Sequence, residues 1–161
     1  MSTQLSDADR ASLRSLRTIA DYQFGAGAGN ALFPTDEPID IRRTSSGRPR
    51  QIIVSGTRVV TYATDGRFTL GYAGGERLAD ALESPAYRVI VGDDSAPFVR
   101  DGKNVFAKFV QDVDPVIRPG DEILVEHYDG ELLGVGRAEL SADGMMDFAS
   151  GMAVKVRDGK Q

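Results

Sequence analysis

Residues 102–110, with the sequence GKNVFAKFV, place two lysines and two phenylalanines in one short segment. Consecutive side chains of a β-strand point to opposite faces, so Phe106 and Phe109 cannot share a face unless a bulge intervenes. One of the two rings should therefore lie at the surface, near Lys103 and Lys108. An exposed ring can stack on an unpaired RNA base while neighbouring ammonium groups meet phosphates. The segment predicts a contact with RNA.

A plain structural strand is the alternative interpretation of the same segment. It would have one solvated face and one inward face, formed by Val105, Ala107 and Phe109. The two interpretations share this inward face and differ only in what the outward side chains do.

A second group of cations occupies residues 42–50, with the sequence RRTSSGRPR. The window 42–67 contains six arginines against one acidic residue, Asp65, which gives a local net charge of +5. Guanidinium groups contact phosphate oxygens through a fork of N–H donors that lysine lacks. A solvated arginine-rich hairpin is the alternative. The basic finger of the first interpretation consists of Arg42, Arg43, Arg48 and Arg50.

Groups with catalytic potential are few in this chain. Hydrolytic or transfer chemistry needs a nucleophile, a base and a charge-stabilising group that converge on one pocket. The sequence has a single histidine, His127, and no cysteine, which excludes cysteine-bound zinc and a His-rich metal site. Asp93 and Asp94, like Asp112 and Asp114, are interpreted as solvated surface residues. We expect no catalytic residue, no metal site and no cofactor.

The glycine-rich run GAGAGN at residues 25–30 does not fit a phosphate-binding loop. Such a loop follows a strand and opens a helix whose N-terminus meets the phosphate. Here the glycines follow a helical pattern and lead into Phe33 and Pro34. We therefore expect a plain connecting segment.

The composition indicates a globular protein of the cytoplasm. Of 161 residues, 41% are hydrophobic and 27% charged, and no apolar run approaches the ~20 residues of a membrane span. The first ten residues lack the apolar core of a signal peptide. The formal net charge is −5, although nucleic-acid-binding domains are usually basic. A composition rich in aspartate and arginine and poor in lysine is similar to that of salt-loving archaea, where acidic surfaces maintain solubility.

The first half of the chain predicts a helix followed by short strands. Ser6 and Asp9 form an S-x-x-D capping box, and apolar residues at helical spacing continue to Phe24, before Gly25 ends the helix. Alternating patterns between glycine turns predict strands at 39–41, 51–54, 58–63 and 67–70, and a helix over 75–82. A domain boundary is expected at residues 83–85.

The second half predicts short strands at 88–91, 105–110, 122–127, 132–140 and 154–157. Helices are expected at 96–101 and at 142–149, the latter capped by Ser141. Short strands with glycine turns favour a small, mostly closed barrel, which removes exposed sheet edges. The predicted fold class is α+β, with a small α+β domain at 1–83 followed by a pseudo-barrel of mixed short strands at 84–161.

The order of elements in residues 102–157 resembles the PUA domain, a small RNA-binding barrel of pseudouridine synthases and archaeosine transglycosylases. The segments that carry the resemblance are GKNVFAKFV, DPVIRPGDEILVEHYDGELLGVGRAEL and AVKVR. The resemblance implies a PUA-type pseudo-barrel in which the glycine loop and the strand after it contact RNA, often through backbone groups. It assigns this role to Gly102, Lys103, Asn104, Val105, Phe106, Ala107 and Lys108, with Arg137, Lys155 and Arg157 near the same face.

The first half is similar to the small domain that precedes the PUA domain in archaeal tRNA-guanine transglycosylases. The similarity lies in YQFGAGAGNALFP, RRTSSGRPRQIIV and DGRFTL, so it covers residues from about 20 to 160 in all. Those enzymes place a catalytic barrel with nucleophilic aspartates and a cysteine-bound zinc before these domains. A barrel of ~250 residues does not fit in this chain, and cysteine is absent.

The leading hypothesis is a non-catalytic RNA-binding protein that binds tRNA, alone or as the RNA-binding subunit of a tRNA-modifying enzyme with a separate catalytic subunit. The alternative is an adaptor that docks to a translation or RNA-processing complex through protein contacts. A small-molecule enzyme is a third hypothesis, with little support. RNA binding that depends on residues 103–108 favours the first, and association that survives nuclease treatment favours the second.

Overall fold

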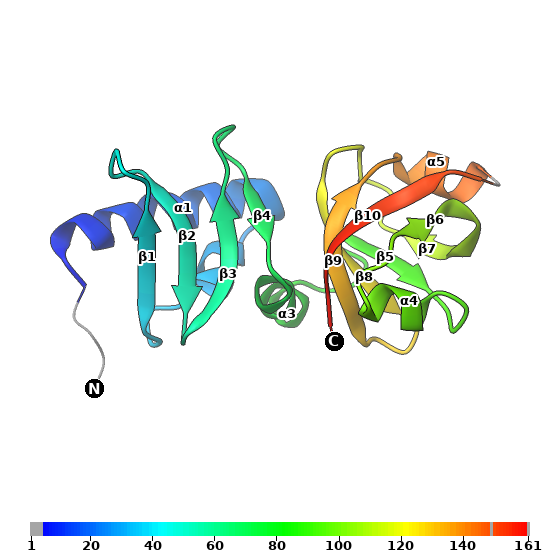
Figure 1. The fold of residues 1–161 in the computed structure, drawn as a ribbon, viewed down its shortest axis with the longest axis horizontal. Helices are drawn as coiled ribbons and strands as arrows, with labels where there is room; N and C mark the ends of the chain where they lie inside the picture. Colours follow the sequence, from blue (N-terminus) through cyan, green and yellow to red (C-terminus); the bar gives the residue numbers. More distant parts are fainter. Residues whose placement is uncertain (1–4, 149, 161) are drawn as a thin grey trace. The chain divides into compact units, whose positions relative to one another are not determined.

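The computed structural model describes residues 5–148 and 150–160. The chain divides into two compact units between Leu82 and Glu83. Each unit has its own sheet and its own buried core (Figure 1). The fold class is α+β, which confirms the prediction from the sequence.

The first unit begins with helix α1 (Asp7–Phe24). The Ser6 hydroxyl accepts a hydrogen bond from the Asp9 backbone N–H at 3.1 Å, and Gly25 follows the helix with a φ of 107°. Both predicted helix boundaries are therefore confirmed. The buried stripe of this helix consists of Leu13, Leu16, Ala20 and Phe24.

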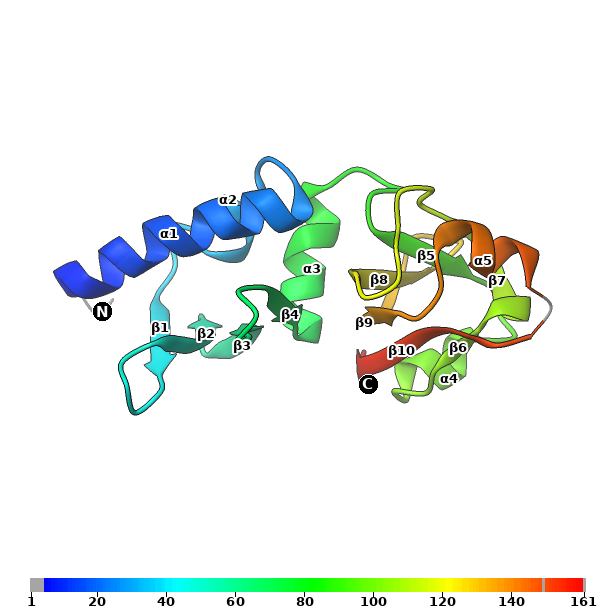
Figure 2. The same ribbon diagram turned by 90° about the horizontal axis from the view of Figure 1, so that it is seen from above.

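A four-stranded antiparallel sheet follows, with its strands in chain order. The register pairs Ile41 with Ile52, Ile52 with Val60, and Val60 with Leu70, so one apolar row crosses all four strands. Helices α1 and α2 lie on one side of this sheet, and no helix of the described residues lies on the opposite face (Figure 2). The elements after α1 are α2 (Ala28–Leu32), β1 (Ile39–Arg43), β2 (Pro49–Val54), β3 (Thr57–Tyr62), β4 (Phe68–Leu70) and α3 (Tyr72–Ala81).

The prediction of a plain connection over residues 25–30 is wrong, because the second half of this run belongs to α2. The Gly29 backbone N–H donates to the Asp21 carboxylate at 2.7 Å. A side chain at position 29 would collide with the backbone of Arg17 on α1. Glycine here allows two helices to touch, whereas the sequence pattern suggested only chain flexibility.

Helix α3 begins at Tyr72 rather than near residue 75. Gly74, which lies outside the predicted span of 75–82, is an interior helical residue. A side chain at this position would collide with the backbone carbonyl of Val59 on β3. The glycine therefore serves close contact between helix and strand.

The second unit contains a six-stranded sheet in the order β6-β10-β9-β8-β5-β7. Strands β5 and β8 are parallel, and the other neighbours are antiparallel. The sheet curls into a nearly closed barrel, because its two edge strands are joined by a single 3-10 turn, η1 (Ala107–Phe109). The other elements are β5 (Arg88–Val91), α4 (Ala96–Arg100), β6 (Val105–Phe106), β7 (Val110–Val113), β8 (Glu122–His127), β9 (Leu132–Ala138), α5 (Ala142–Asp147) and β10 (Met152–Gly159).

The prediction of one strand over residues 105–110 is wrong. Strand β6 pairs with β10 and strand β7 pairs with β5, so the chain changes sheet edge at the turn between them. The turn breaks the expected alternation: Val105, Ala107 and Val110 are buried, whereas Phe109, which was predicted to face inward, is only half-buried. Helix α5 ends at Asp147, and residue 149 of its predicted span lies outside the described residues.

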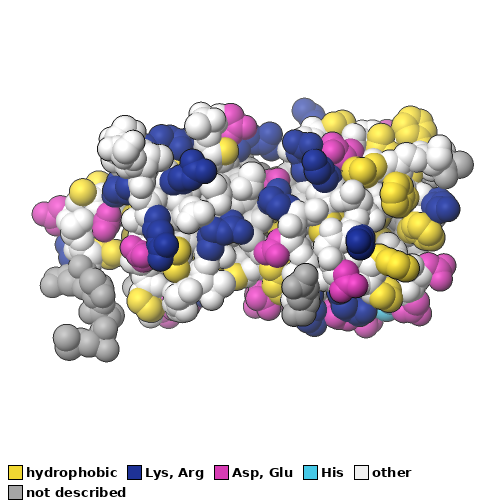
Figure 3. All heavy atoms as spheres, viewed as in Figure 1, with side chains coloured by type: hydrophobic (Ala, Val, Ile, Leu, Met, Phe, Trp, Pro, Cys, Tyr) yellow, Lys and Arg dark blue, Asp and Glu magenta, His cyan; other side chains and the backbone are white. Residues whose placement is uncertain are grey.

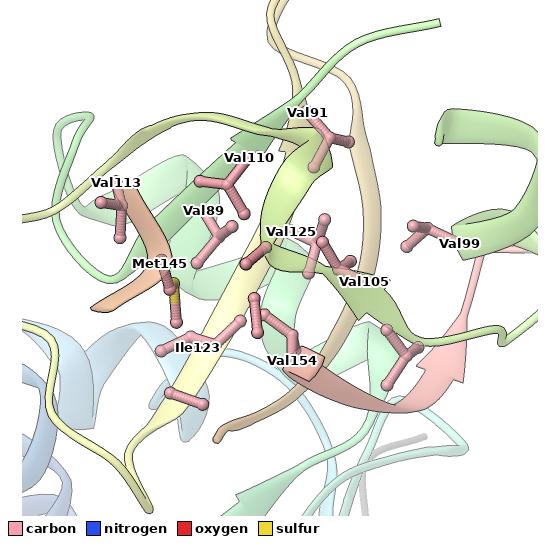
Figure 4. Packing of buried hydrophobic residues seen from close by; sticks show 14 of the residues in the cluster. Val89, Val91, Val99, Val105, Val110, Val113, Ile123, Val125, Met145 and Val154 are labelled. Carbon is pink, nitrogen blue, oxygen red and sulfur yellow. The ribbon is translucent and has the colours of Figure 1, made fainter. Parts of the chain in front are cut away.

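Aliphatic side chains from nearly every element fill the barrel of the second unit (Figure 4). Val89 from β5, Val125 from β8 and Val154 from β10 are fully buried there. Asp114 is also buried, and its carboxylate accepts hydrogen bonds from the backbone N–H groups of Tyr87 at 2.8 Å and Val116 at 3.1 Å. Its interpretation as a solvated residue is therefore wrong, since it caps two turns.

Candidate nucleic-acid interface

A surface hollow on the second unit gathers three phenylalanines beside a lysine. We call it the aromatic hollow. Of its rings, Phe98 is 57% exposed and Phe106 is 46% exposed, whereas Phe109 is half-buried. The prediction that one phenylalanine of residues 102–110 reaches the surface is confirmed for Phe106. The lining consists of Asp94, Ser95, Phe98, Lys103, Asn104, Phe106 and Phe109.

A glycine turn after α4 positions the basic side of this hollow. Gly102 adopts a φ of 87°, a left-handed conformation that favours glycine. Its N–H donates to the carbonyl of Val99 at 2.9 Å, and the N–H of Lys103 donates to the carbonyl of Phe98 at 2.8 Å. These two bonds fold the chain back on α4, so Lys103 and Phe98 come to line the same hollow.

The other residues predicted to contact RNA in this segment differ in where their side chains lie. Val105 and Ala107 are buried, so only their backbone groups can reach a ligand. The Asn104 carboxamide oxygen accepts a hydrogen bond from the Val156 N–H at 2.9 Å, which ties the turn to β10. Lys108 is exposed, and its Nζ lies 5.1 Å from the centre of the Phe109 ring.

Three further predicted cations lie on the outward face of β9 and β10. Lys155 is directly opposite Arg137 in the strand register, and Arg157 is two residues further along the same face. Arg157 forms an ion pair with the buried carboxylate of Glu122, and Arg137 is 3.2 Å from Glu139. Lys155 is exposed, so it is the cation of this group best placed to meet a ligand.

Two of the four arginines of the predicted finger make contacts within the protein. Arg43 donates to the Asp9 carboxylate at 2.6 Å and to the carbonyl of Gly47 at 2.9 Å. The guanidinium of Arg48 lies 4.3 Å from the centre of the Tyr62 ring and donates to backbone carbonyls. These two side chains fix the β1–β2 hairpin in place.

The exposed arginines belong to a surface that the sequence pattern did not define. The face of the first sheet away from α1 has a polar row in register, Arg42, Gln51, Thr61 and Thr69. Arg58 lies beside this row and donates to the Thr61 hydroxyl at 3.1 Å. Basic side chains gather over these strands (Figure 3). We call this surface the open sheet face.

A second, polar hollow adjoins the aromatic hollow and was not predicted. Its lining comes from the β5–α4 loop, the start of β7 and the β8–β9 hairpin. Only the turn signal in GDDSAP marked that loop in the sequence, and nothing in the sequence connected it to residues 108–111. The lining consists of Gly92, Asp93, Asp94, Ser95, Lys108, Phe109, Gln111 and Tyr128.

His127 joins two walls of this region instead of forming a catalytic group. Its Nε2 is 2.7 Å from Oδ1 of Asp93, and its Nδ1 is 3.1 Å from Oδ1 of Asp129. The Tyr128 hydroxyl donates to the second oxygen of Asp93 at 3.2 Å. The hydrogen bond to Asp93 raises the pKa of His127 above its usual value, against the opposing effect of desolvation.

Ion pairs at fixed positions account for the two largest pKa shifts. Hydrogen bonds from Arg77 and Ser55 lower the pKa of Glu37 to about 2. Hydrogen bonds from Arg100 and Lys160 lower the pKa of Glu131 to about 2. Both carboxylates are thus acceptors in structural ion pairs at neutral pH and are unsuited to proton transfer.

Among the described residues, no group of three or more His, Cys, Asp or Glu side chains has a geometry that could hold a metal ion. Within the same residues, no helix is both long and apolar enough to cross a membrane.

Known families match the two units in succession. Residues 14–85 match the family described as patch-forming domain C2 of tRNA-guanine transglycosylase. Residues 87–160 match the PUA domain. The chain thus carries a C2-type domain followed by a PUA domain. Its PUA domain is the barrel that bears both hollows, and its C2 domain is the unit that bears the open sheet face.

The curated relatives are archaeal transglycosylases. The tRNA-guanine(15) transglycosylase of Pyrococcus furiosus is 48% identical over 145 residues, which are 89% of this chain and 24% of that protein. The protein of the same name from Methanothermobacter thermautotrophicus is 45% identical over 158 residues, which are 98% of this chain and 23% of that protein. The chain therefore spans about a quarter of the length of these relatives.

Solved structures share the fold of the whole chain at low sequence identity. A hypothetical protein from Pyrococcus horikoshii has a TM-score of 0.73 and 21% identity, with 100% of this chain and 95% of that chain covered. A conserved PUA domain protein from Thermoplasma acidophilum has a TM-score of 0.66 and 22% identity, with 96% and 91% covered. These likenesses support the fold of both units.

Proposed function

We propose that this PUA-domain protein binds tRNA and has no catalytic activity of its own. The observation that carries the proposal is the aromatic hollow, where the exposed ring of Phe106 lies beside Lys103 in a PUA domain. Unpaired RNA bases stack on such rings while cations meet the phosphates. The names of the relatives support tRNA as the RNA.

In this proposal, two surfaces of the protein contact the RNA. The aromatic hollow receives an unpaired end, because only unstacked bases present a free face to an aromatic ring. The open sheet face contacts backbone phosphates through Arg42 and Arg58, helped by the exposed Arg50. The first surface contributes stacking energy and the second contributes electrostatic energy that falls with salt.

Catalysis belongs to a partner in this proposal. The relatives are about four times as long as this chain, and the matched quarter consists of the C2 and PUA domains. A catalytic subunit that modifies tRNA would supply the missing reaction. The composition further suggests the cytoplasm of a salt-loving archaeon, where an acidic protein remains in solution.

A competition gel shift tests the proposal. The protein, bound to a labelled tRNA transcript, is challenged with unlabelled tRNA or with duplex DNA of equal length. We expect tRNA to compete more strongly, because 2′-hydroxyls and unpaired ends are present only in RNA. Equal competition by the two nucleic acids would refute RNA binding as the function. In the same preparation, base exchange into tRNA, followed by mass spectrometry, should be undetectable.

One observation favours the adaptor as a second candidate function. Three apolar side chains are exposed: Val116 on the loop after β7 (66%), Met146 on α5 (51%) and Phe148 just after α5 (54%). Exposed apolar side chains in one region often mark protein contacts. Association with a translation or RNA-processing complex that survives nuclease treatment, and that Phe148→Ala abolishes, would favour this function over RNA binding.

A further inference from the structure

The aromatic and polar hollows share one wall. Asp94, Ser95 and Phe109 line both of them. The aromatic hollow continues with Phe98 and Phe106 on its side, and the polar hollow continues with carboxylate, amide and phenol groups on its own side. The two adjoining hollows therefore place a surface suited to stacking beside one suited to hydrogen bonding.

Ser95 is the unusual residue of the shared wall. It is only 4% exposed, and its hydroxyl has no hydrogen-bond partner among the described residues. A buried hydroxyl is normally paired, because leaving it unpaired in the folded protein costs free energy. No fully enclosed side-chain polar atom of the described residues lacks a partner, so this hydroxyl opens onto the hollows that Ser95 lines. It is therefore available to a group that enters them.

The two aspartates of the polar hollow differ in their partners. Asp93 is held by His127 on one oxygen and by the Tyr128 hydroxyl on the other. Asp94 is exposed, and within residues 5–148 and 150–160 its carboxylate has no hydrogen-bond or ion-pair partner. The free carboxylate and the free hydroxyl therefore belong to adjacent residues that line the same two hollows. A carboxylate only accepts hydrogen bonds, whereas a hydroxyl both donates and accepts.

We propose that the polar hollow receives the base adjacent to the one stacked in the aromatic hollow, and that it selects bases carrying an amino group. Asp94 accepts a hydrogen bond from the exocyclic amino group of adenine, cytosine or guanine, and Ser95 bonds to a neighbouring ring atom. Uracil carries no exocyclic amino group, and its two carbonyl oxygens repel a carboxylate. The inference rests on the proposed RNA-binding function and adds base selection to it.

The remaining wall residues fit a nucleotide in this position. Tyr128 is 59% exposed, and its ring lies 4.0 Å from the ring of His127, centre to centre, which gives the base a supported aromatic surface. Lys108 lines the polar hollow and Lys103 the aromatic one, so each nucleotide has a cation near its phosphate. His127 acts here as a positioning residue, since it holds Asp93 and supports Tyr128.

Short single-stranded RNAs test the selection directly. The probes are fluorescein-labelled five-nucleotide RNAs made of adenosine, of uridine, or of purine riboside, which is adenosine without the amino group. Adenine and purine differ little in stacking area, so their affinity ratio isolates the amino group. We expect the full chain to bind the adenosine probe about tenfold more tightly than the purine probe in fluorescence anisotropy titrations.

Three variants test whether Asp94 and Ser95 select the base. Asp94→Asn replaces an acceptor by a group that also donates, so the adenosine-to-purine ratio should fall to near one. Ser95→Ala removes only the hydroxyl oxygen and should lower the same ratio. Asp147→Asn on α5 is the matched control, because it removes the same charge from an exposed residue outside both hollows. Circular dichroism confirms that each variant is folded.

The outcomes distinguish a failure of base selection from a failure of RNA binding. The inference is supported if the adenosine-to-purine affinity ratio falls to near one in Asp94→Asn and is retained in Asp147→Asn. If the wild type binds all three probes equally, or if Asp94→Asn keeps the ratio, base selection is overturned while RNA binding stands. If no single-stranded RNA binds and tRNA does not bind either, the proposed function fails, and the inference fails with it.

Discussion

Nε2 of His127 lies 2.7 Å from Oδ1 of Asp93, so a buried imidazole connects the end of β8 to the loop between β5 and α4. The other imidazole nitrogen faces Asp129, and the Tyr128 ring stacks on the imidazole. This arrangement gives the only histidine of the chain a structural task beside the polar hollow. It also makes the stability of the PUA domain dependent on pH.

The first prediction concerns that dependence. Because the pKa of His127 is raised in the folded state, its contribution to stability is fully present below the unfolded value of 6.5 and is lost as pH rises through the folded value. Urea unfolding, followed by circular dichroism, should show that stability is lost as the pH rises above 6.5 and passes through the folded pKa of His127. His127→Gln should be less stable at the lower pH and nearly flat across the range. Parallel curves for the two proteins would contradict the prediction.

The second prediction concerns the exposed ring of the aromatic hollow. Replacing Phe106 by alanine should weaken RNA binding by about 1–3 kcal/mol if the ring stacks on a base. The slope of log affinity against log salt should hardly change, because the ring neutralises no phosphate. The control is Phe148→Ala, which removes a ring of similar exposure just after α5. Equal effects of the two substitutions on tRNA affinity would show that Phe106 makes no specific interaction with the RNA.

The sequence predicted most of the fold because local signals and the global structure agree. The capping box at Ser6, the hydroxyl cap at Ser141 and most of the alternating strands formed where their patterns indicated. Glycine was the residue whose role could not be predicted. A glycine in a turn and a glycine in a close helix contact look the same in sequence, as Gly29 and Gly74 show.

The candidate site was predictable only in part, for a different reason. Lys103 and Phe106 are near in sequence, so their grouping with Gly102 was visible from local spacing. Asp94, Ser95 and the β8–β9 hairpin reach the same region through sheet pairing over long separations in the chain. No local pattern encodes such pairing. Similarly, charge counting found the arginines but not the ion pair that holds Arg43.

The third prediction tests the close contact of α1 with α2. Gly29→Ala would normally stabilise a helix by about 1 kcal/mol. Here the added methyl group meets the backbone of Arg17, which cannot move without bending α1. We expect a loss of about 1–3 kcal/mol in the free energy of unfolding, as for other overpacked contacts. Asn30→Ala, at an exposed position of the same helix, should be neutral or slightly stabilising in the same denaturant titration.

The last prediction separates Arg42, Arg50 and Arg58 from Arg43, whose guanidinium pairs with the Asp9 carboxylate. Replacing Arg42, Arg50 and Arg58 by alanine should flatten the salt dependence of RNA affinity by roughly 0.7 for each phosphate that is no longer neutralised, and should weaken all RNAs similarly. Arg43→Ala should instead lower stability with less change of slope, because its charge already faces Asp9. Arg14→Ala on α1 removes an exposed charge from the opposite side of the sheet and is the control.

Titrations from about 50 mM to about 200 mM salt have the range to show this difference, since the Debye length shortens to about 8 Å within it. In the concentrated salt of a halophile the electrostatic share of binding is smaller, so stacking in the aromatic hollow should then carry more of the affinity. A triple variant that keeps the wild-type slope would mean that Arg42, Arg50 and Arg58 neutralise no RNA phosphate. The phosphate contacts would then come from the cations of the PUA domain, such as Lys103, Lys108 and Lys155, and the open sheet face would have to serve another partner.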